Sequence, residues 1–192
     1  MNKLLVATLA VLWAAPARSA TYAIDPDHTS VMFTVRHLVG HVTGQFDKFT
    51  GSFDYEPGNP QLWKASATID ASSVDTRVAA RDKHLRSDDF FDVGKYPVLS
   101  FVSTKVTAVK GDHAKLLGKL TILDTAKPIA LDLEIGGLQK DANGIEHAAF
   151  TAKGRINRKD FGLTWNDTIE TGGVLVGDDV DITIEVEGLR QK

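Results

Sequence analysis

The chain has 192 residues, a formal charge of −3 and no cysteine. The absence of thiols excludes disulfides, thiolate chemistry, cysteine-ligated metals and a lipid anchor on an N-terminal cysteine. A mildly acidic chain is also a poor candidate for binding nucleic acid or anionic lipid surfaces, because proteins bind these surfaces through clustered Lys and Arg.

The first residues have the pattern of a secretory signal peptide. An early lysine precedes a run over residues 4–15 that is apolar except for Thr8, and Pro16 follows it. Such a run is too short for a stable membrane anchor. We therefore expect residues 1–19 to be removed on export to the periplasm, with cleavage after Ala20 as the alternative. Residues 20–192 then form one domain.

Alternation of apolar and polar residues dominates this domain and predicts about eight strands. The expected ranges are 31–38, 44–55, 65–71, 98–107, 115–122, 129–135, 146–158 and 181–187. Short turn sequences such as "EPGNP" and "KDANG" separate them, so neighbouring strands should be antiparallel. The strand at 98–107 has two candidate inner faces: Leu99 with Phe101, or Val98 with Val102 and Val106.

One segment lacks the alternation of a strand. Residues 72–91 are rich in Ala, Arg, Asp and Lys, and their few aliphatic residues fall near one helical face. We expect one helix of two to three turns over residues 76–86, capped at its start by Ser73 or Asp75.

Eight antiparallel strands can form a sandwich or a barrel. Asp132, Glu134 and Glu185 exclude a transmembrane barrel, because its outer face must be apolar. The apolar faces carry many small residues: Ala65, Ala67, Ala71, Gly118, Ala148, Ala152 and Gly154. These leave volume for an apolar guest, or they admit a helix or a bent strand, and the composition leaves both interpretations open.

Four segments resemble the signature sequences of the YceI family: "YAIDPDHTSVMFTVRHL" (22–38), "LRSDDFFDVGKYPVLSF" (85–101), "GKLTILDTAKPIALDLEI" (118–135) and "AAFTAKGRINRKDFGLTW" (148–165). The resemblance extends over about residues 21–188. It implies an all-β fold, an extended eight-stranded antiparallel lipocalin-like barrel, which is often periplasmic and binds a polyisoprenoid or similar long-chain lipid inside. Tyr22 stands where the family often has Trp, and Asp124 where it often has Gly; neither alters the apolar faces.

The candidate cavity residues lie mainly on the apolar faces of the expected strands: Phe33, Val35, Phe46, Phe53, Ala67, Ile69, Phe101, Leu120, Leu131, Phe150, Ala152 and Ile184. Phe90 and Phe91 follow the helix, where the backbone turns, so the two rings should diverge. One would plug the barrel end, and the other would pack under the helix or a loop. A packed corner and direct contact with a lipid tail are the two interpretations of this pair.

Three polar residues continue inner faces and are candidates for binding a lipid head group. His37 extends the inner face of the first strand. Arg158 and Asp160, two residues apart, would face the same way at the end of strand 146–158 and form a pair. The alternative is a buried ion pair that closes a strand corner before Gly162.

We expect no metal site and no cofactor other than a bound lipid. His37 and His41 are four residues apart, a spacing that suits a helix but not the break expected at Gly40. His28 should satisfy a turn, and the remaining histidines lie in separate polar contexts.

Three functions compete. The first is a carrier or sequestering protein for a polyprenol, quinone or polyprenyl phosphate, serving transport or storage. The second is an enzyme acting on such a lipid, with Asp160 and His37 as acid and base; no nucleophile-elbow, P-loop or zincin motif supports it. The third is a stress-related interaction protein that delivers lipid to a membrane redox complex. A homodimer that shields the barrel mouth is a further expectation.

Overall fold

Strands make up most of the computed structural model, which describes residues 19–167 and 174–192. Residues 1–18, most of the expected signal peptide, lie outside this part. The strands are β1 (Ala20–Ile24), β2 (Ser30–His37), β3 (Gly40–Phe46), β4 (Phe49–Tyr55), β5 (Lys64–Asp70), β6 (Val74–Asp75), β7 (Val98–Lys110), β8 (His113–Ile122), β9 (Thr125–Lys140), β10 (Glu146–Asn157) and β11 (Val176–Arg190). The helices are α1 (Ala79–Leu85) and three 3-10 turns, η1 (Pro60–Leu62), η2 (Ala71–Ser73) and η3 (Arg158–Phe161).

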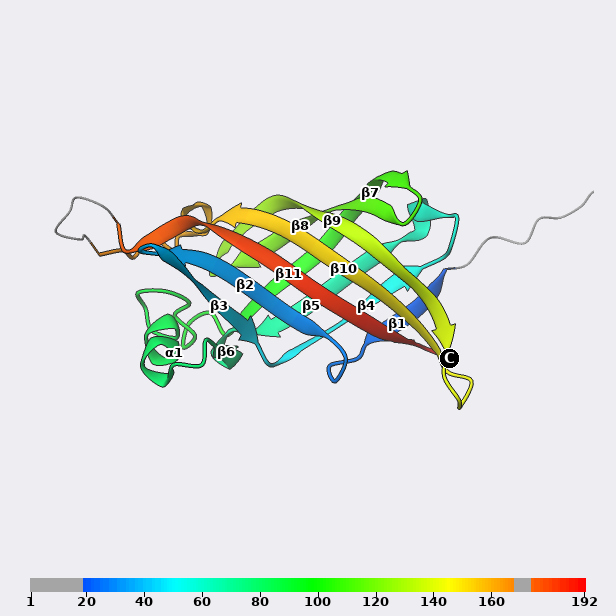
Figure 1. Ribbon diagram of the computed structural model, residues 1–192, viewed down its shortest axis with the longest axis horizontal. Coiled ribbons are helices and arrows are strands. Elements are labelled where there is room, and N and C mark those ends of the chain that lie inside the picture. The colour runs from blue at the N-terminus through cyan, green and yellow to red at the C-terminus, as the bar shows by residue number, and fades with distance from the viewer. Residues whose placement is uncertain (1–18, 168–173) are drawn as a thin grey trace, which may run out of the picture.

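A ring of eight antiparallel strands forms the barrel (Figure 1). Its order is β1-β4-β5-β7-β8-β9-β10-β11, and it closes because β1 pairs with β11 through Tyr22 opposite Arg190. Strands β2, β3 and β6 continue from β11 beyond the ring, toward the end where α1 lies. We call this the helix end and the opposite end the far end. The eight-stranded antiparallel barrel is confirmed, and the sandwich is excluded.

The expected single strand over residues 44–55 is wrong, because the chain breaks at Asp47 and Lys48 into β3 and β4. Ser73 holds this break: its carbonyl accepts from Asp47 N at 3.2 Å, and its hydroxyl accepts from Lys48 N at 3.0 Å. The two halves therefore serve different neighbours, β3 pairing with β2 and β6, and β4 with β1 and β5. Strands β1 and β6 were not expected.

The single helix is present but shorter than the expected range of 76–86. Val78 is its N-cap, and no side chain caps that position, so the expected capping by Ser73 or Asp75 is wrong. Instead the buried Asp82 of α1 accepts from the backbone N of Thr76 at 2.8 Å and from its hydroxyl at 2.5 Å. In the described residues, no helix is both long enough and apolar enough to cross a bilayer.

A register shift explains why β7 had two candidate inner faces. Leu99 and Phe101 pack inside, whereas Val98 and Val102 are 47% and 54% exposed. The pairing with β8 shifts between residues 103 and 105, and this reverses the alternation. Val106 therefore also packs against the core.

Glycines on the inner face provide space for aromatic rings. A Cβ at Gly118 would lie 2.3 Å from the Phe101 ring, and one at Gly188 would lie 2.5 Å from the Phe53 ring. At these positions the lack of a side chain serves packing and leaves no empty volume.

We expect Gly118→Ala to destabilise the barrel by about 1–3 kcal/mol, because the added methyl overlaps Phe101 and the carbonyl of Val102. Gly94→Ala is the control, since a Cβ there has no heavy atom within 4 Å. Urea unfolding followed by circular dichroism measures both. Equal stability of the two variants would contradict this account of the glycine.

Candidate functional site

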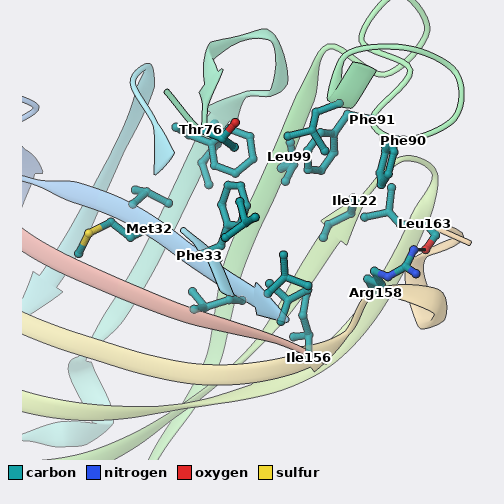
Figure 2. Close-up of a pocket in the computed structure, with 18 of the residues that line it drawn as sticks. Met32, Phe33, Thr76, Phe90, Phe91, Leu99, Ile122, Ile156, Arg158 and Leu163 are labelled. Carbon is teal, nitrogen blue, oxygen red and sulfur yellow. Dashed lines mark hydrogen bonds between the residues drawn. The ribbon is translucent and has the colours of Figure 1, made fainter. Parts of the chain in front are cut away.

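The barrel encloses a cavity of about 600 Å³ toward its helix end (Figure 2). This volume lies within the range of about 300–1,000 Å³ typical of small-molecule sites. Its walls are almost entirely apolar and come from strands on every side of the barrel and from the segment around α1. Thirteen of the residues that the sequence singled out line it: Phe33, Val35, His37, Phe46, Ala67, Ile69, Phe90, Phe91, Phe101, Leu120, Leu131, Ile184 and Arg158.

A packed cluster of aromatic rings closes the far end. This aromatic plug consists of Tyr22, Phe53, Tyr55, Trp63 and Phe150, with successive ring centroids 4.8–6.4 Å apart. Tyr22 is 1% exposed and donates its hydroxyl to Glu146 Oε1 at 2.7 Å. Its burial and this bond to a carboxylate raise the pKa of the phenol, which stays protonated.

Three candidate cavity residues, Phe53, Phe150 and Ala152, border a second space of about 120 Å³ beside the aromatic plug, not the large cavity. Ala67 and Phe101 line both spaces and mark the place where the two meet. The interior is thus narrow and filled at the far end, and wide toward the helix end.

Phe90 and Phe91 diverge, as their position after the helix predicts. Phe90 packs between His84 of α1 and Trp165, with centroid distances of 5.1 and 5.2 Å. Phe91 points into the barrel and contacts Phe46 edge-on at 5.6 Å. Both rings also line the cavity, so the packed corner is at the same time part of the cavity wall.

Polar side chains gather at the helix end of the cavity. Val78 lines the cavity beside α1 and is 46% exposed. The polar lining residues toward this end are His37, Thr76, Arg81, His84 and Trp165. We call these five residues the polar mouth.

Arg81 is the cation of the polar mouth. It donates from Nε to the Thr76 hydroxyl at 2.7 Å and from Nη2 to the Thr76 carbonyl at 2.8 Å. Among the described residues Nη1 has no acceptor, so this end of the guanidinium can bind an oxygen of a ligand.

Arg158 has a structural environment. Its side chain is buried, and it donates to three backbone carbonyls: from Nε to Gly177 at 2.8 Å, and from Nη1 to Leu163 at 2.6 Å and Trp165 at 2.8 Å. Nη2 faces the Asp178 carboxylate at 3.7 Å, too far for a hydrogen bond. Burial lowers the pKa of the guanidinium and Asp178 opposes this, but arginine remains charged.

The expected pairing of Arg158 with Asp160 is wrong. Strand β10 ends at Asn157, and residues 158–161 form η3, so the alternation that placed the two side chains on one face no longer applies. Asp160 is exposed and does not line the cavity, and Asp178 faces Arg158 in its place.

Sequence reasoning missed Thr76, Arg81, His84 and Trp165 as candidate head-group residues. They lie on α1 and on loops, where no two-residue alternation shows which side chains point inward. Within residues 72–91 the only signal was the high polarity of the segment. That polarity does not distinguish residues that line the cavity from residues that are exposed to solvent.

The family model for the YceI-like domain matches residues 22–188, nearly the whole described barrel. This chain belongs to the YceI family. It is 39% identical over 182 residues to the protein YceI of Escherichia coli O157:H7, covering 93% of this chain and 92% of the relative.

Solved structures have the same barrel. A YceI protein from Campylobacter jejuni is 36% identical and superposes with a TM-score of 0.72, covering 82% of this chain and 90% of the other. A domain from Saccharophagus degradans, described as polyisoprenoid-binding, gives a TM-score of 0.67 at 16% identity, covering 90% and 99%. At that identity the likeness shows the fold.

We expect Arg158→Ala to lower the free energy of unfolding by about 2–5 kcal/mol, because three backbone carbonyls, two of them in buried hydrogen bonds, lose a charged donor. Arg155→Ala is the control: this exposed arginine pairs with the exposed Asp181, so the loss should be much smaller. Urea unfolding measures both. A fully stable Arg158→Ala would contradict the structural role.

Proposed function

We propose that this protein binds one long-chain isoprenoid or related amphiphilic lipid in the barrel cavity, with the tail inside and the head group at the polar mouth. Polyprenols, quinones and polyprenyl phosphates have this form. The proposed role is transport, storage or sequestration in the periplasm. The observation that carries this proposal is an almost entirely apolar cavity of about 600 Å³ whose polar lining residues, apart from Thr29, gather toward the helix end.

The exposure of interior residues supports a hollow barrel. Val31, Phe33 and Val35 line the cavity, and each is only half-buried. Tyr22 of the aromatic plug is 1% exposed, and Ala148 is fully buried. Apolar side chains that border unfilled space gain contacts when an apolar guest enters.

The cavity volume limits the length of lipid tail that the barrel can enclose. At roughly 30 Å³ per methylene-sized group, taken from the volume that a water molecule occupies in the liquid, about 600 Å³ corresponds to about twenty such groups. That is about four isoprene units. At about 0.8 kcal/mol per buried methylene, each unit contributes roughly 4 kcal/mol. Four units exceed or match an association cost of about 4–15 kcal/mol, so the tail supplies the affinity.

The polar mouth is suited to a head group that accepts hydrogen bonds. Arg81 offers a cation, while His37, His84 and Trp165 offer ring N–H groups or, for histidine, a ring acceptor. We assign head-group selectivity to these residues, and to Arg158 the task of holding the loop that carries Trp165.

A binding role fits better than catalysis. Asp160 is exposed outside the cavity that His37 lines, so the acid–base pair considered from the sequence is not assembled. The neighbour from Saccharophagus degradans is described as polyisoprenoid-binding, which also favours a binding function. Two further proposals are delivery of lipid to a membrane redox complex and formation of a homodimer. Neither is assigned to a particular surface of the barrel.

The test is native mass spectrometry of protein purified from the periplasm without detergent, beside an organic extract of the same sample. We expect one added mass per chain that matches an isoprenoid in the extract. An empty protein that also fails to bind added polyprenols and quinones would overturn the proposal.

We expect Ala67→Phe to weaken binding of a four-unit polyprenol by at least about tenfold. A tenfold weaker affinity corresponds to a loss of about 1.4 kcal/mol of binding free energy. The new ring would occupy the place where the two internal spaces meet. Val102→Phe is the matched control, because it adds a ring to an outward position that is 54% exposed. Fluorescence titration compares them, and equal affinities would place the tail elsewhere.

We expect Arg81→Ala to weaken binding of a polyprenyl phosphate about tenfold or more, because a charge-assisted hydrogen bond contributes about 1.5–3 kcal/mol. Binding of the alcohol of the same length should change little. Lys83→Ala, an exposed cation on the same helix, is the control. A loss that is the same for alcohol and phosphate would remove Arg81 from head-group recognition.

A further inference from the structure

Two histidines and three carboxylates meet on the outer surface near the far end, away from the cavity. Asp25 and His28 lie in the turn between β1 and β2, and Glu187 lies in β11. His147 is near the start of β10, and Asp141 is in the hairpin that precedes it. Residues 28 and 147 are far apart in sequence, so the cluster exists only in the folded barrel.

Glu187 links the two histidines of this cluster. Val186 lines the cavity, so the next residue of β11 faces outward. His28 Nδ1 lies 2.8 Å from Asp25 Oδ2, and His147 Nδ1 lies 2.7 Å from Glu187 Oε1. One ligand atom each from Asp25, His28 and Glu187 lies within 4.8 Å of the others.

These separations are close to those of a metal site. Ligand atoms about 2.0–2.2 Å from a tetrahedral Zn²⁺ are roughly 3.4 Å apart. Closing the three atoms around an ion therefore needs a movement of about an ångström. The His28 side chain is 62% exposed on a surface turn and can make this movement. The Asp25 and Glu187 side chains are 13% and 30% exposed and are therefore held more firmly.

His147 is placed to orient Glu187. Its Nδ1 contacts the carboxylate, and its Nε2 is buried without a hydrogen-bond partner among the described residues. Asp141 Oδ2 lies 3.6 Å from that Nε2, beyond hydrogen-bond distance. Carboxylate–histidine contacts of this kind hold metal ligands in position in known sites.

We propose that Asp25, His28 and Glu187 bind a divalent transition-metal ion, with His147 positioning Glu187. One imidazole and two carboxylates favour Zn²⁺ over Mg²⁺ or Ca²⁺, which prefer all-oxygen sites. The exposed side of His28 leaves room for water as a further ligand. The ion would link the turn between β1 and β2 to β11. This link lies next to the pairing of β1 with β11 that closes the ring.

Calorimetric titration with ZnCl₂ tests the proposal, using the untagged protein after treatment with EDTA and its removal. We expect one Zn²⁺ per chain, and a rise in Tm with added Zn²⁺ because the ion binds the folded state. His28→Ala and Glu187→Gln should each weaken binding at least about tenfold, a size typical of changes to metal sites. Both positions are on the surface, and thermal unfolding without metal checks that the variants fold.

His113→Ala is the matched control. His113 is another exposed histidine beside an aspartate, with Nε2 3.3 Å from Asp112 Oδ1, but among the described residues it belongs to no group of three closely spaced ligand atoms. Its replacement should leave Zn²⁺ affinity unchanged. No binding by the wild-type protein, or equal affinity in wild type and His28→Ala, would overturn the site. Neither result bears on lipid binding, which is measured separately.

Discussion

The pairing of β1 with β11 is the constraint on which the rest of the barrel depends. A sheet of this length has two edges, and closure removes them by pairing the first strand with the last. Strand β1 has only five residues, so it covers the far part of β11, and β2 pairs with the remainder. The ring of eight therefore closes at one end only. At the other end β2, β3 and β6 extend the wall, and the segment containing α1 lies beside them.

The two ends of the interior differ because their side chains differ. At the far end, glycines let aromatic rings approach the backbone, and the rings fill the space. Toward the helix end, branched aliphatic and phenylalanine side chains stand around a volume that they do not fill. Arg158 stabilises the rim of this end by bonding to carbonyls on both sides of the segment that includes residues 168–173, which lie outside the described part. The buried Arg158 guanidinium, hydrogen-bonded to backbone carbonyls, thus holds in place segments that border the apolar cavity.

Much of this could be predicted from the sequence, and the failures have physical causes. Alternation located the long strands and many residues of the cavity wall, because each inner face is apolar. It did not reveal the break at residues 47–48, since "FDKF" (46–49) has a phenylalanine at each end and the interruption depends on Ser73, which is distant in sequence. It failed at Arg158 because a 3-10 turn replaced the strand.

The helix and loops lack the two-residue alternation that marks inward-facing side chains in strands, so the roles of Arg81 and Trp165 at the polar mouth needed the structure. The surface cluster around Glu187 was equally hidden. His28 and His147 sit in unrelated polar contexts along the chain, and only the closure of the ring brings them together. Local pattern predicts the faces of strands, whereas contacts between distant segments come from topology.

The aromatic plug fills the far end of the interior, so the wide part of the cavity lies toward the helix end. Under the proposed function, the single long tail of a lipid would enter this space first and leave it last. The head group would then stay at the helix end, where a partner would meet it without the barrel having to open.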